Sequence, residues 1–466
     1  MVFSSIVFLC AFLPIVLVLD RRLRSTTHKN IALTVASVLF YAYGEPRMVA
    51  LLLLSTALNY VLGRLVEPGR ARRKEYLIAG IVCNLLLLVV FKYLPMIVGT
   101  INALFRAEIV IRDIPLPLGI SFYTFQALSY VIDVYRGDVA CQKTYYKVLL
   151  YISFFPQLVA GPIVKYHDFD YQIDHRSASV NDMATGLRRF GLGLAKKVLL
   201  ADVFASCADA LFALPKDQLF APAAWLAAFA YMMQIYMDFS AYSDMAIGMA
   251  AALGFKIPEN FRHPYASLSV REFWRRWHIS LSGWFREYLY IPLGGNRLGR
   301  KRAIINRFIV FALCGLWHGA NWTFVVWGLL HGLALLFEEY VDLDEWSQRA
   351  RRAYVLLFVL FTFVVFRSDT LGDAVYHLRQ MFFGWGLTSA LYIPFVSQLN
   401  PLFLVAVVVA LTISGTLPER IVRAVQVSNK GALLDSVGYL VTLGFVFLCL
   451  LALASGTYSP FIYFRF

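Results

Sequence analysis

Two histidines in long apolar or aromatic runs are the first candidates for chemistry. His318 lies in 303–332, AIINRFIVFALCGLWHGANWTFVVWGLLHG, ten residues after Phe308. Along a helix that distance is about 15 Å, which puts the side chain near the middle of a hydrocarbon core roughly 30 Å thick. An ionisable residue at that depth is costly and indicates a functional site, although a histidine that hydrogen-bonds across helices explains the pattern equally well. Small residues beside it could thin the helix and open a cavity: Gly315, Gly319, Ala320 and Asn321.

The second histidine, His278, lies in 271–297, REFWRRWHISLSGWFREYLYIPLGGNR. Drawn as a helix, this segment has an aromatic face and a polar face. The aromatic face holds Phe273, Trp274, Trp277, Leu281, Trp284, Phe285 and Tyr288, and Arg271, Glu272, Arg275, Ser282 and Arg286 lie elsewhere. The pattern predicts an interfacial helix with its rings at headgroup level. His278 either stays at that surface or points into the bundle, with Arg276 and Trp277 beside it as candidates for binding or orienting a substrate.

A third group of polar residues interrupts the apolar run 231–249. Gln234, Asp238 and Tyr242 follow i, i+4, i+8 spacing and share a helix face, with Asp244 on a neighbouring face. Carboxylates in such a run cannot face lipid. Either they form a polar lining that orients a catalytic histidine or binds substrate, or they bond between helices and pair with a nearby arginine.

These residue types suit acyl transfer better than hydrolysis or metal chemistry. A buried histidine can act as general base on an alcohol, and a basic, aromatic mouth suits a phosphate-bearing, thioester-activated donor. Asn321 or tryptophan indole N–H groups are candidates for stabilising an oxyanion, and a structural role is favoured for His331. The sequence has no G-x-S-x-G, P-loop, GxGxxG or HExxH motif, and His278 and His318 lack zinc-ligand spacing, so no metal is expected.

The composition defines the class of protein in which these residues act. Of 466 residues, 59% are hydrophobic and 15% are charged, against roughly 25% charged in soluble domains. A mean hydropathy of +0.64 excludes a soluble enzyme, and long continuous apolar runs disfavour a transmembrane β-barrel. The net charge of +14 comes from basic residues in short loops, which indicates positive-inside topology rather than nucleic-acid binding. The six cysteines are scattered without a CxxC pair and are expected to be free thiols.

The sequence therefore predicts an all-α polytopic membrane bundle of roughly eleven spans plus re-entrant or interfacial helices. The bundle is expected to form a single domain over 1–466. Apolar helices are predicted at 1–20, 30–44, 48–66, 77–97, 145–163, 187–213, 222–253, 304–319, 322–340, 353–367, 400–416 and 435–455.

Two segments and the loop charges complete this prediction. The segment 114–137 is too polar for a clean span and is expected to be broken or re-entrant, and 154–166 holds two prolines and a glycine that indicate a broken helix or a kinked span. The N-terminus and 368–395 are expected outside. Basic stretches are expected in the cytoplasm: 256–302, 348–352 and 420–430.

At this point the motifs resemble a family. EFWRRWHISLSGWFREYLYIPLGGNR followed by GLWHGANWTFVVWGLLHG is similar to the signature of the membrane-bound O-acyltransferases. The resemblance is to the bacterial branch of the alginate O-acetyltransferase membrane subunit and its peptidoglycan and teichoic-acid relatives. GISFYTFQALSYVIDVYRGD, FFPQLVAGPIVKYHDF, QIYMDFSAYSDMAIGMAALGF and SPFIYFRF extend it over nearly the whole chain.

The resemblance implies a site and a reaction. The family's membrane histidine falls on His318 and its second signature position on His278. The implied fold is a ring of tilted helices around a funnel, in the cytoplasmic (inner) membrane. Acetyl-CoA is the implied donor, with no bound cofactor. The acceptor is an extracytoplasmic polysaccharide, alginate or a similar exopolysaccharide, reached directly or through a periplasmic acetyltransferase partner.

Alternatives remain open. One keeps the fold and changes the acceptor or donor to peptidoglycan, D-alanyl teichoic acid or a lipid. Another is a non-enzymatic channel or flippase, which the intramembrane Asp238 and Asp244 would line. Direct transfer and a covalent acetyl-histidine step are also both compatible with the sequence.

Overall fold

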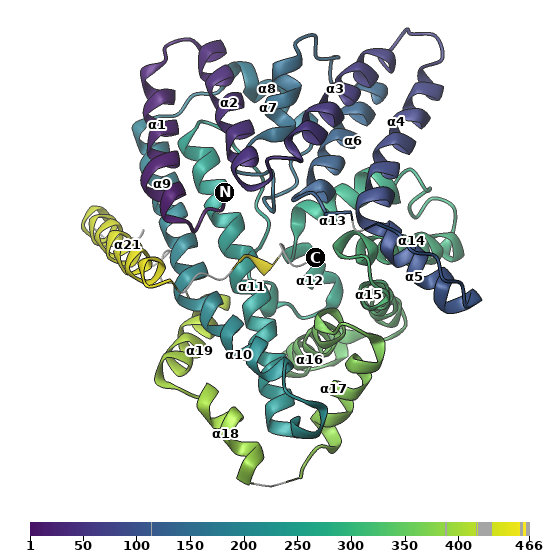
Figure 1. The fold of residues 1–466 in the computed structure, drawn as a ribbon, viewed down its shortest axis with the longest axis vertical. Coiled ribbons are helices and arrows are strands. Elements are labelled where there is room, and N and C mark those ends of the chain that lie inside the picture. Colours follow the sequence, from purple (N-terminus) through teal and green to yellow (C-terminus); the bar gives the residue numbers. More distant parts are fainter. Residues whose placement is uncertain (113, 387–388, 416, 418–430, 457–459, 463–466) are drawn as a thin grey trace. The chain divides into compact units, whose positions relative to one another are not determined.

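All the elements of the structure are helices. It is a computed structural model that describes residues 1–112, 114–386, 389–415, 417, 431–456 and 460–462 (Figure 1). The all-α prediction is confirmed for this part of the chain. The predicted cytoplasmic stretch 420–430 lies outside the described residues.

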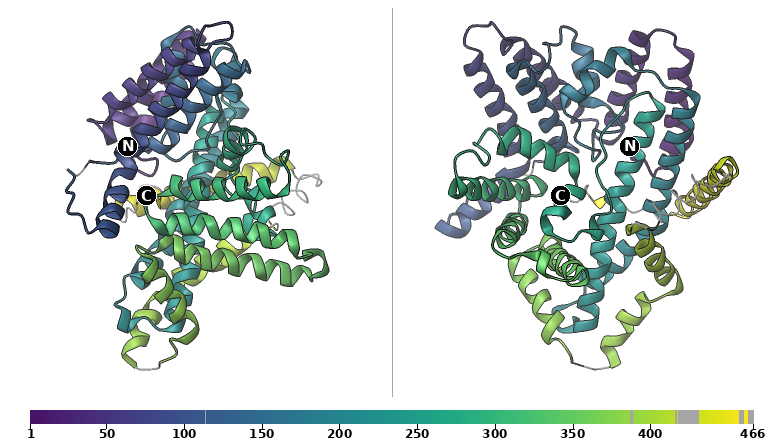
Figure 2. Two further views of the ribbon diagram at one scale, coloured as in Figure 1. Left: turned by 90° about the vertical axis from the view of Figure 1, so that its right-hand side faces the viewer. Right: turned by 180° about the vertical axis from the view of Figure 1, so that it is seen from behind.

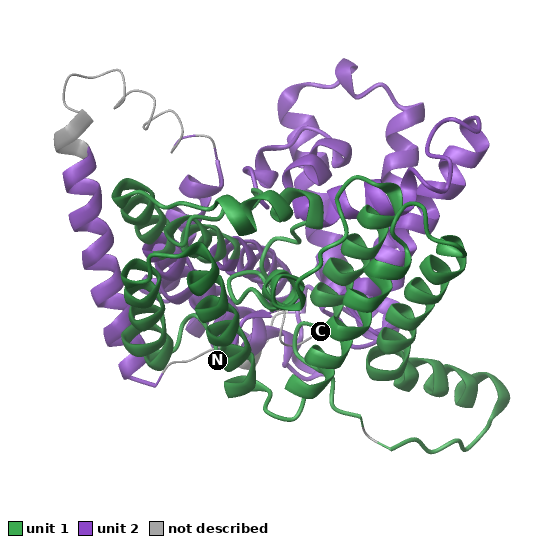
Figure 3. Ribbon diagram, turned by 90° about the horizontal axis from the view of Figure 1, so that it is seen from above, with its two compact units in different colours: residues 1–190, 243–259 green, residues 191–242, 260–466 purple. Residues whose placement is uncertain are grey.

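The chain folds into two compact units, coloured separately in Figure 3. Unit 1 comprises residues 1–190 and 243–259, and unit 2 comprises residues 191–242 and 260–466. The boundaries fall inside α9 (Val180–Ala195) and α11 (Ala221–Ala252), so each of these helices contributes to both units. The single domain predicted over 1–466 stays a prediction.

Unit 1 is built around α6 (Ile120–Arg136), which packs against α3, α4, α7 and α8. The other helices of this unit, besides the first part of α9, are α1 (Leu13–Arg22), α2 (Thr26–Gly44), α3 (Val49–Leu65), α4 (Arg73–Leu88), α5 (Leu94–Phe105), α7 (Tyr145–Ser153) and α8 (Tyr166–His175), with π-helical turns at Phe8–Phe12 and Val89–Tyr93. Of the broken or re-entrant helix expected over 114–137, the break is wrong, because Ile120–Arg136 form one helix, and the re-entrant alternative stays a prediction. The helix is unbroken, and its polar side chains are buried among its neighbours, which is why the segment does not read as an apolar span.

The predicted break in 154–166 is confirmed. Helix α7 ends at Ser153 and α8 begins at Tyr166, and the backbone between them is irregular and buried. Tyr151 helps to satisfy this backbone, because its hydroxyl donates to the carbonyl oxygen of Val164 at 2.8 Å. Irregular backbone within a membrane protein is tolerated when protein groups satisfy it in this way.

Unit 2 contains both candidate histidines. Besides parts of α9 and α11, its helices are α10 (Asp202–Phe212), α12 (Val270–Arg276), α13 (Ile279–Phe285), α14 (Arg300–His318), α15 (Trp322–Tyr340), α16 (Gln348–Arg367), α17 (Leu371–Phe383), α18 (Ser389–Gln398), α19 (Pro401–Ser414) and α21 (Gly431–Ala454). Short turns lie at Lys196–Ala201, Lys216–Gln218, Pro264–Ala266, Arg286–Tyr290 and Leu343–Glu345. Helix α15 packs between α14 and α16 (Figure 2) and also contacts α12. The predicted helices 222–253, 304–319 and 322–340 agree with α11, α14 and α15 to within a few residues.

Glycines bring α14 and α15 into backbone contact. A Cβ at Gly315 would lie 2.1 Å from the carbonyl oxygen of Phe324, and one at Gly328 would lie 2.1 Å from that of Phe311. A Cβ at Gly319 would lie 2.0 Å from the Phe324 ring. The expectation that Gly315 and Gly319 open a cavity is therefore wrong, because α15 fills the space that they leave.

Few helices pass a simple test for membrane spans. Among the residues that the structure describes, two helical stretches, Arg73–Phe105 and Asp435–Ala454, are long and apolar enough on their own. The bent pair Tyr392–Gln398 and Pro401–Ser414, with 59° between its halves, becomes a third if it counts as one span. This number is well below the predicted eleven, partly because α14 and α16 begin with basic residues.

Candidate functional site

The two histidines predicted to be catalytic lie together in unit 2. His318 is the last residue of α14, and His278 immediately precedes α13. Their ring centroids are 6.1 Å apart. The side chains are buried, with 4% of His318 and none of His278 exposed. The fold thus places two imidazoles from distant parts of the sequence in one site.

Aromatic rings surround His318. Trp317, Trp327 and Phe366 have ring centroids 5.0, 5.2 and 5.4 Å from its own, all in edge-on arrangements. Such a wall keeps water away from the imidazole, and electrostatic interactions strengthen where water is excluded. The few groups that neighbour His318 therefore determine how well a proton or a charge in this site is stabilised.

His278 lies at a break between two short helices rather than on the face of one helix. Helix α12 ends at Arg276 and α13 begins at Ile279, and His278 between them has φ 45° and ψ 51°, in the left-handed region. The prediction of one interfacial helix over 271–297 is therefore wrong. Its aromatic face is buried in protein; Trp277 stacks on Phe273 at 5.4 Å, for example.

Asn260 holds the break in place, and the sequence did not single it out. Its side-chain oxygen lies 3.3 Å from His278 Nδ1 and accepts hydrogen bonds from the Ser280 backbone N–H and hydroxyl at 3.2 and 2.8 Å. Its backbone oxygen accepts from the Ile279 N–H at 3.0 Å. An asparagine in a polar connection ordinarily indicates a turn, so no spacing rule would have found it.

His331 has the structural role that was favoured. The Trp274 indole N–H donates to His331 Nδ1 at 3.1 Å, and His331 Nε2 lies 3.4 Å from the Thr362 hydroxyl. Both ring nitrogens are therefore engaged by the protein core.

Asp238 belongs to a buried ion network. Lys197 Nζ lies 2.8 Å from Asp238 Oδ1 and 2.8 Å from Asp202 Oδ1. The second oxygen of Asp238 accepts a hydrogen bond from the Ile462 backbone N–H at 2.6 Å. Tyr242, one turn further along α11, contacts the ring of Phe461 at 4.8 Å. The shared face of Asp238 and Tyr242 is confirmed, but its partners are a lysine and residues near the C-terminus.

Asp244 belongs to unit 1, where it pairs with Arg189. The Arg189 guanidinium contacts it at 3.0 and 2.8 Å and also bonds Glu259 at 2.6 Å. The salt-bridge interpretation is confirmed for Asp244.

A cationic pocket of about 460 Å³ lies in unit 2. The residues of the predicted polar face that line it are Arg271, Arg275, Ser282 and Arg286. Arg307 and Cys314 of α14 line it as well. Cys314 is four residues, one helical turn, before His318, so the pocket reaches close to the histidine along α14. Arg276 does not line the pocket and instead pairs with Glu272 at 2.6 Å.

The two kinds of candidate oxyanion donor differ in their surroundings. Asn321 caps α15 through its side-chain oxygen, which accepts from the Thr323 N–H at 3.2 Å, and its amide donates to the Asp369 carbonyl oxygen at 2.7 Å. The indole N–H of Trp327 is buried and has no acceptor among the residues that the structure describes.

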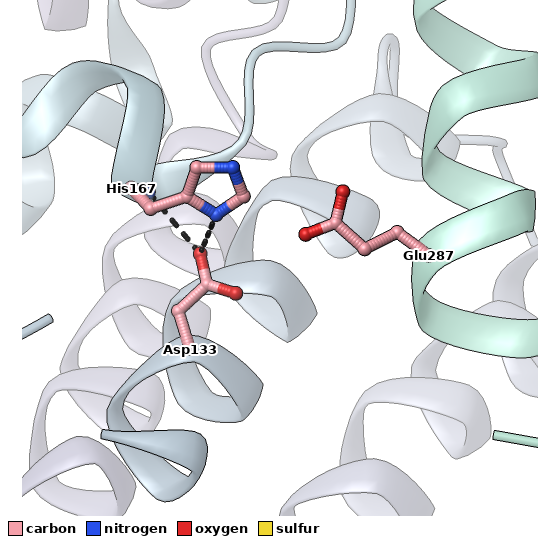
Figure 4. Close-up of side chains that lie close together, drawn as sticks. All are labelled: Asp133, His167 and Glu287. Atoms are coloured by element: carbon pink, nitrogen blue, oxygen red, sulfur yellow. Dashed lines mark hydrogen bonds and ion pairs between the residues drawn. The ribbon is translucent and has the colours of Figure 1, made fainter. Parts of the chain in front are cut away.

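Unit 1 holds a histidine–carboxylate pair that the sequence did not single out. Asp133 Oδ2 accepts from the His167 backbone N–H at 3.1 Å and lies 3.1 Å from the His167 ring Nδ1 (Figure 4). The pair ties the end of α6 to the start of α8.

Known proteins resemble this chain over its whole length. Residues 143–366, which include both candidate histidines, match the model of MBOAT, the membrane-bound O-acyltransferase family. The chain is 39% identical to a "probable alginate O-acetylase" of Pseudomonas putida, over the full length of both proteins. It is 40% identical to the protein of the same description from Pseudomonas aeruginosa, over 83% of this chain and 75% of that relative. It is 33% identical to a peptidoglycan O-acetyltransferase of Helicobacter pylori, over 82% and 80%.

The chain therefore belongs to the membrane-bound O-acyltransferase family. Within that family it lies in the branch of the alginate O-acetylases, and it is an O-acyltransferase and a membrane protein.

Proposed function

We propose that this protein is an O-acetyltransferase of the cytoplasmic membrane that moves acetyl groups from cytosolic acetyl-CoA toward an extracytoplasmic polysaccharide. Alginate or a similar exopolysaccharide is the proposed acceptor, reached through a partner enzyme on the outer face. The buried pair of His278 and His318 carries the proposal, because it offers a base in a site enclosed by aromatic rings. The names of the Pseudomonas relatives support an acetyl donor and a polysaccharide acceptor.

In the proposed reaction His318 accepts the proton of an acceptor hydroxyl. The hydroxyl oxygen attacks the thioester carbonyl, a C–O bond forms and the C–S bond breaks. The thiolate of coenzyme A then takes the proton back from the imidazolium. The buried indole N–H of Trp327, 5.2 Å from His318 between ring centroids, is a suitable donor to the oxyanion. A relay through acetyl-histidine gives the same net reaction in two steps. An imidazole nitrogen forms a C–N bond as the C–S bond breaks, and the acceptor oxygen then forms the C–O bond as the C–N bond breaks.

The cationic pocket is the proposed entry for the donor. Four arginines line it, and Arg271, Arg275 and Arg286 come from the stretch with cytoplasmic-type charge. Guanidinium groups bind phosphates, so they suit the phosphates of acetyl-CoA, while the apolar side chains of Val310 and Phe311, which line the pocket from α14, suit its uncharged arm. Glu339 ion-pairs with the fourth, Arg307, and compensates part of the positive charge.

The proposal includes a topology. The N-terminus lies outside, roughly eleven segments cross the membrane, and tilted helices surround a funnel. The long apolar helices Arg73–Phe105 and Asp435–Ala454 support the membrane assignment.

The test is transfer of label from acetyl-CoA in proteoliposomes that contain the outer-face partner and the glycan. We expect His318→Ala to lower the rate by on the order of a hundredfold or more. His377→Gln is the matched control, since His377 is also buried in unit 2 and its Nε2 lies 3.1 Å from the Ala224 carbonyl oxygen, which a glutamine amide can still bond. Equal rates in wild type and His318→Ala would overturn the catalytic assignment. A donor that works only when bound to a carrier protein would favour D-alanyl transfer. Peptidoglycan is tested as a second acceptor, because the Helicobacter pylori relative is a peptidoglycan O-acetyltransferase.

A further inference from the structure

The connection between α11 and α12 holds Asn260, which contacts the three consecutive residues from His278 to Ser280. Asn260 is fully buried. Its side chain bonds His278 and Ser280, and its backbone oxygen accepts from Ile279. Two residues on, the Arg262 N–H donates to the carbonyl oxygen of Arg276 at 2.9 Å. The segment from 260 to 262 therefore runs beside the break and stabilises its left-handed backbone.

The hydrogen bonds of Asn260 fix which atom of its amide faces His278. The Ser280 backbone N–H can only donate, and it points at the same side-chain atom at 3.2 Å. That atom must be the carbonyl oxygen, because an NH₂ group in its place would put two hydrogen-bond donors, the amide and the Ser280 N–H, against each other. A carbonyl oxygen only accepts, so the partner nitrogen of His278, Nδ1, carries the proton.

We propose that Asn260 is a positioning residue that holds His278 as the tautomer protonated at Nδ1, which makes Nε2 the basic nitrogen of this imidazole. The inference rests on the proposed function, in that His278 acts beside His318 in acyl transfer. The proton on Nδ1 faces the connection at Asn260, and the Nε2 lone pair is the one available to a hydroxyl or an imidazole in the site.

The structure also provides the contrast that makes the assignment specific. His331 is equally buried in the same unit, but its Nδ1 accepts from the Trp274 indole, so its proton lies on Nε2. The fold therefore holds its two fully buried histidines in opposite tautomers through one neighbour each.

Two substitutions at Asn260 separate positioning from support of the fold. Asn260→Leu removes the acceptor and keeps the branched shape and the number of side-chain heavy atoms, and we expect it to lower kcat by roughly ten- to a hundredfold, with the donor KM unchanged. Asn260→Asp keeps an acceptor for every bond and adds a negative charge that favours the protonated imidazole. We expect acidification to abolish its activity at a higher pH than in wild type, with the acidic limb of the kcat profile displaced upward by about one pH unit.

Asn59→Leu is the matched control. Asn59 is also fully buried and bonds another side chain, Asn84 at 3.1 Å, but it belongs to unit 1. Folded protein is quantified for each variant by size-exclusion chromatography, and rates are expressed per folded molecule. We expect Asn59→Leu to change neither kcat nor the pH profile.

Spectroscopy of the histidine ring keeps this inference distinct from the proposed function. With ¹⁵N-labelled histidine, wild type should show His278 protonated at Nδ1, and His278→Gln assigns the signal. A wild-type His278 protonated at Nε2 would overturn the inference whether or not acetyl transfer is observed. So would a folded Asn260→Leu with wild-type kcat, or an Asn260→Asp profile that coincides with wild type. If Asn260→Leu does not fold, Asn260→Asp and the wild-type spectrum decide.

Discussion

At the scale of single residues, hydrogen-bond partners decide what a buried group can do. His278 and His331 are both inaccessible to solvent, and both lie among aromatic rings. One faces a carbonyl acceptor and the other an indole donor. The same side chain therefore presents a different nitrogen in each place, and only the fold reveals which.

The Lys197 network gives a stability prediction. Lys197 and Asp238 each have 2% of their side chain exposed, so Lys197→Met leaves two carboxylates near each other without their cation. We expect a loss of about 3–5 kcal/mol, because an uncompensated buried charge is strongly destabilising. The midpoint of thermal unfolding in detergent measures it.

The double variant Lys197→Met/Asp238→Asn is the control for this prediction. It removes one of the uncompensated charges, and we expect it to be more stable than Lys197→Met alone. If the single variant unfolds at the wild-type temperature, the ion network does not stabilise the fold.

Sequence reasoning at this scale found residues that are unusual for their surroundings. His318 and Asp238 stood out as ionisable groups in apolar runs, and their burial agrees with that signal. Asn260 and Lys197 did not stand out, since a polar residue in a connection and a lysine beside another lysine both look solvated. Their roles depend on partners that are 18 and 41 residues away, as the numbering of His278 and Asp238 shows.

At the scale of helices, amphipathic spacing predicted faces but not what covers them. The single helix drawn over 271–297 is wrong, yet four of the residues placed on its polar face line the cationic pocket: Arg271, Arg275, Ser282 and Arg286. The aromatic face was assigned to the membrane surface, whereas its rings pack within the protein. Periodicity cannot distinguish lipid from protein, because both cover an apolar face equally well.

The contact between α14 and α15 leads to a second prediction. Gly315→Ala introduces a Cβ 2.1 Å from the Phe324 carbonyl oxygen, so the helices must separate. We expect a loss of about 1–3 kcal/mol and reduced acyl transfer, since His318 lies three residues further along α14. Gly444→Ala in α21 is the control, because nothing lies within 4 Å of its Cβ position. Equal unfolding midpoints for Gly315→Ala and Gly444→Ala would contradict the close contact between α14 and α15.

The cationic pocket leads to a third prediction, in which a cysteine at the exposed pocket residue Asn296 reports on occupancy. We expect acetyl-CoA to slow alkylation of Asn296→Cys by a small maleimide in a variant without native cysteines. Arg275→Ala should raise the acetyl-CoA concentration that gives half of this protection by roughly tenfold, since charge-assisted hydrogen bonds contribute about 1.5–3 kcal/mol. Alkylation that is indifferent to acetyl-CoA would contradict a donor site in this pocket.

At the scale of the whole molecule, composition established the class and left the topology open. The apolar composition predicted a helical membrane protein, and both the helices and the family agree. The number of spans is harder to predict, because helices that pack on one another keep polar and charged residues that a hydropathy test rejects. Helix α6 is the clearest case, since it buries Gln126 and Asp133 inside unit 1.

The fourth prediction concerns α3, whose 17 residues span about 25 Å. The turn before it contains Arg47, and the basic loop after it contains Ala71, both exposed. In a variant without native cysteines, we expect Arg47→Cys to react with an impermeant maleimide in intact spheroplasts, and Ala71→Cys to react only after permeabilisation. That result would put the basic loop in the cytoplasm and support an N-terminus outside. The reverse pattern would invert the topology, and modification of both from outside would mean that α3 does not cross the membrane.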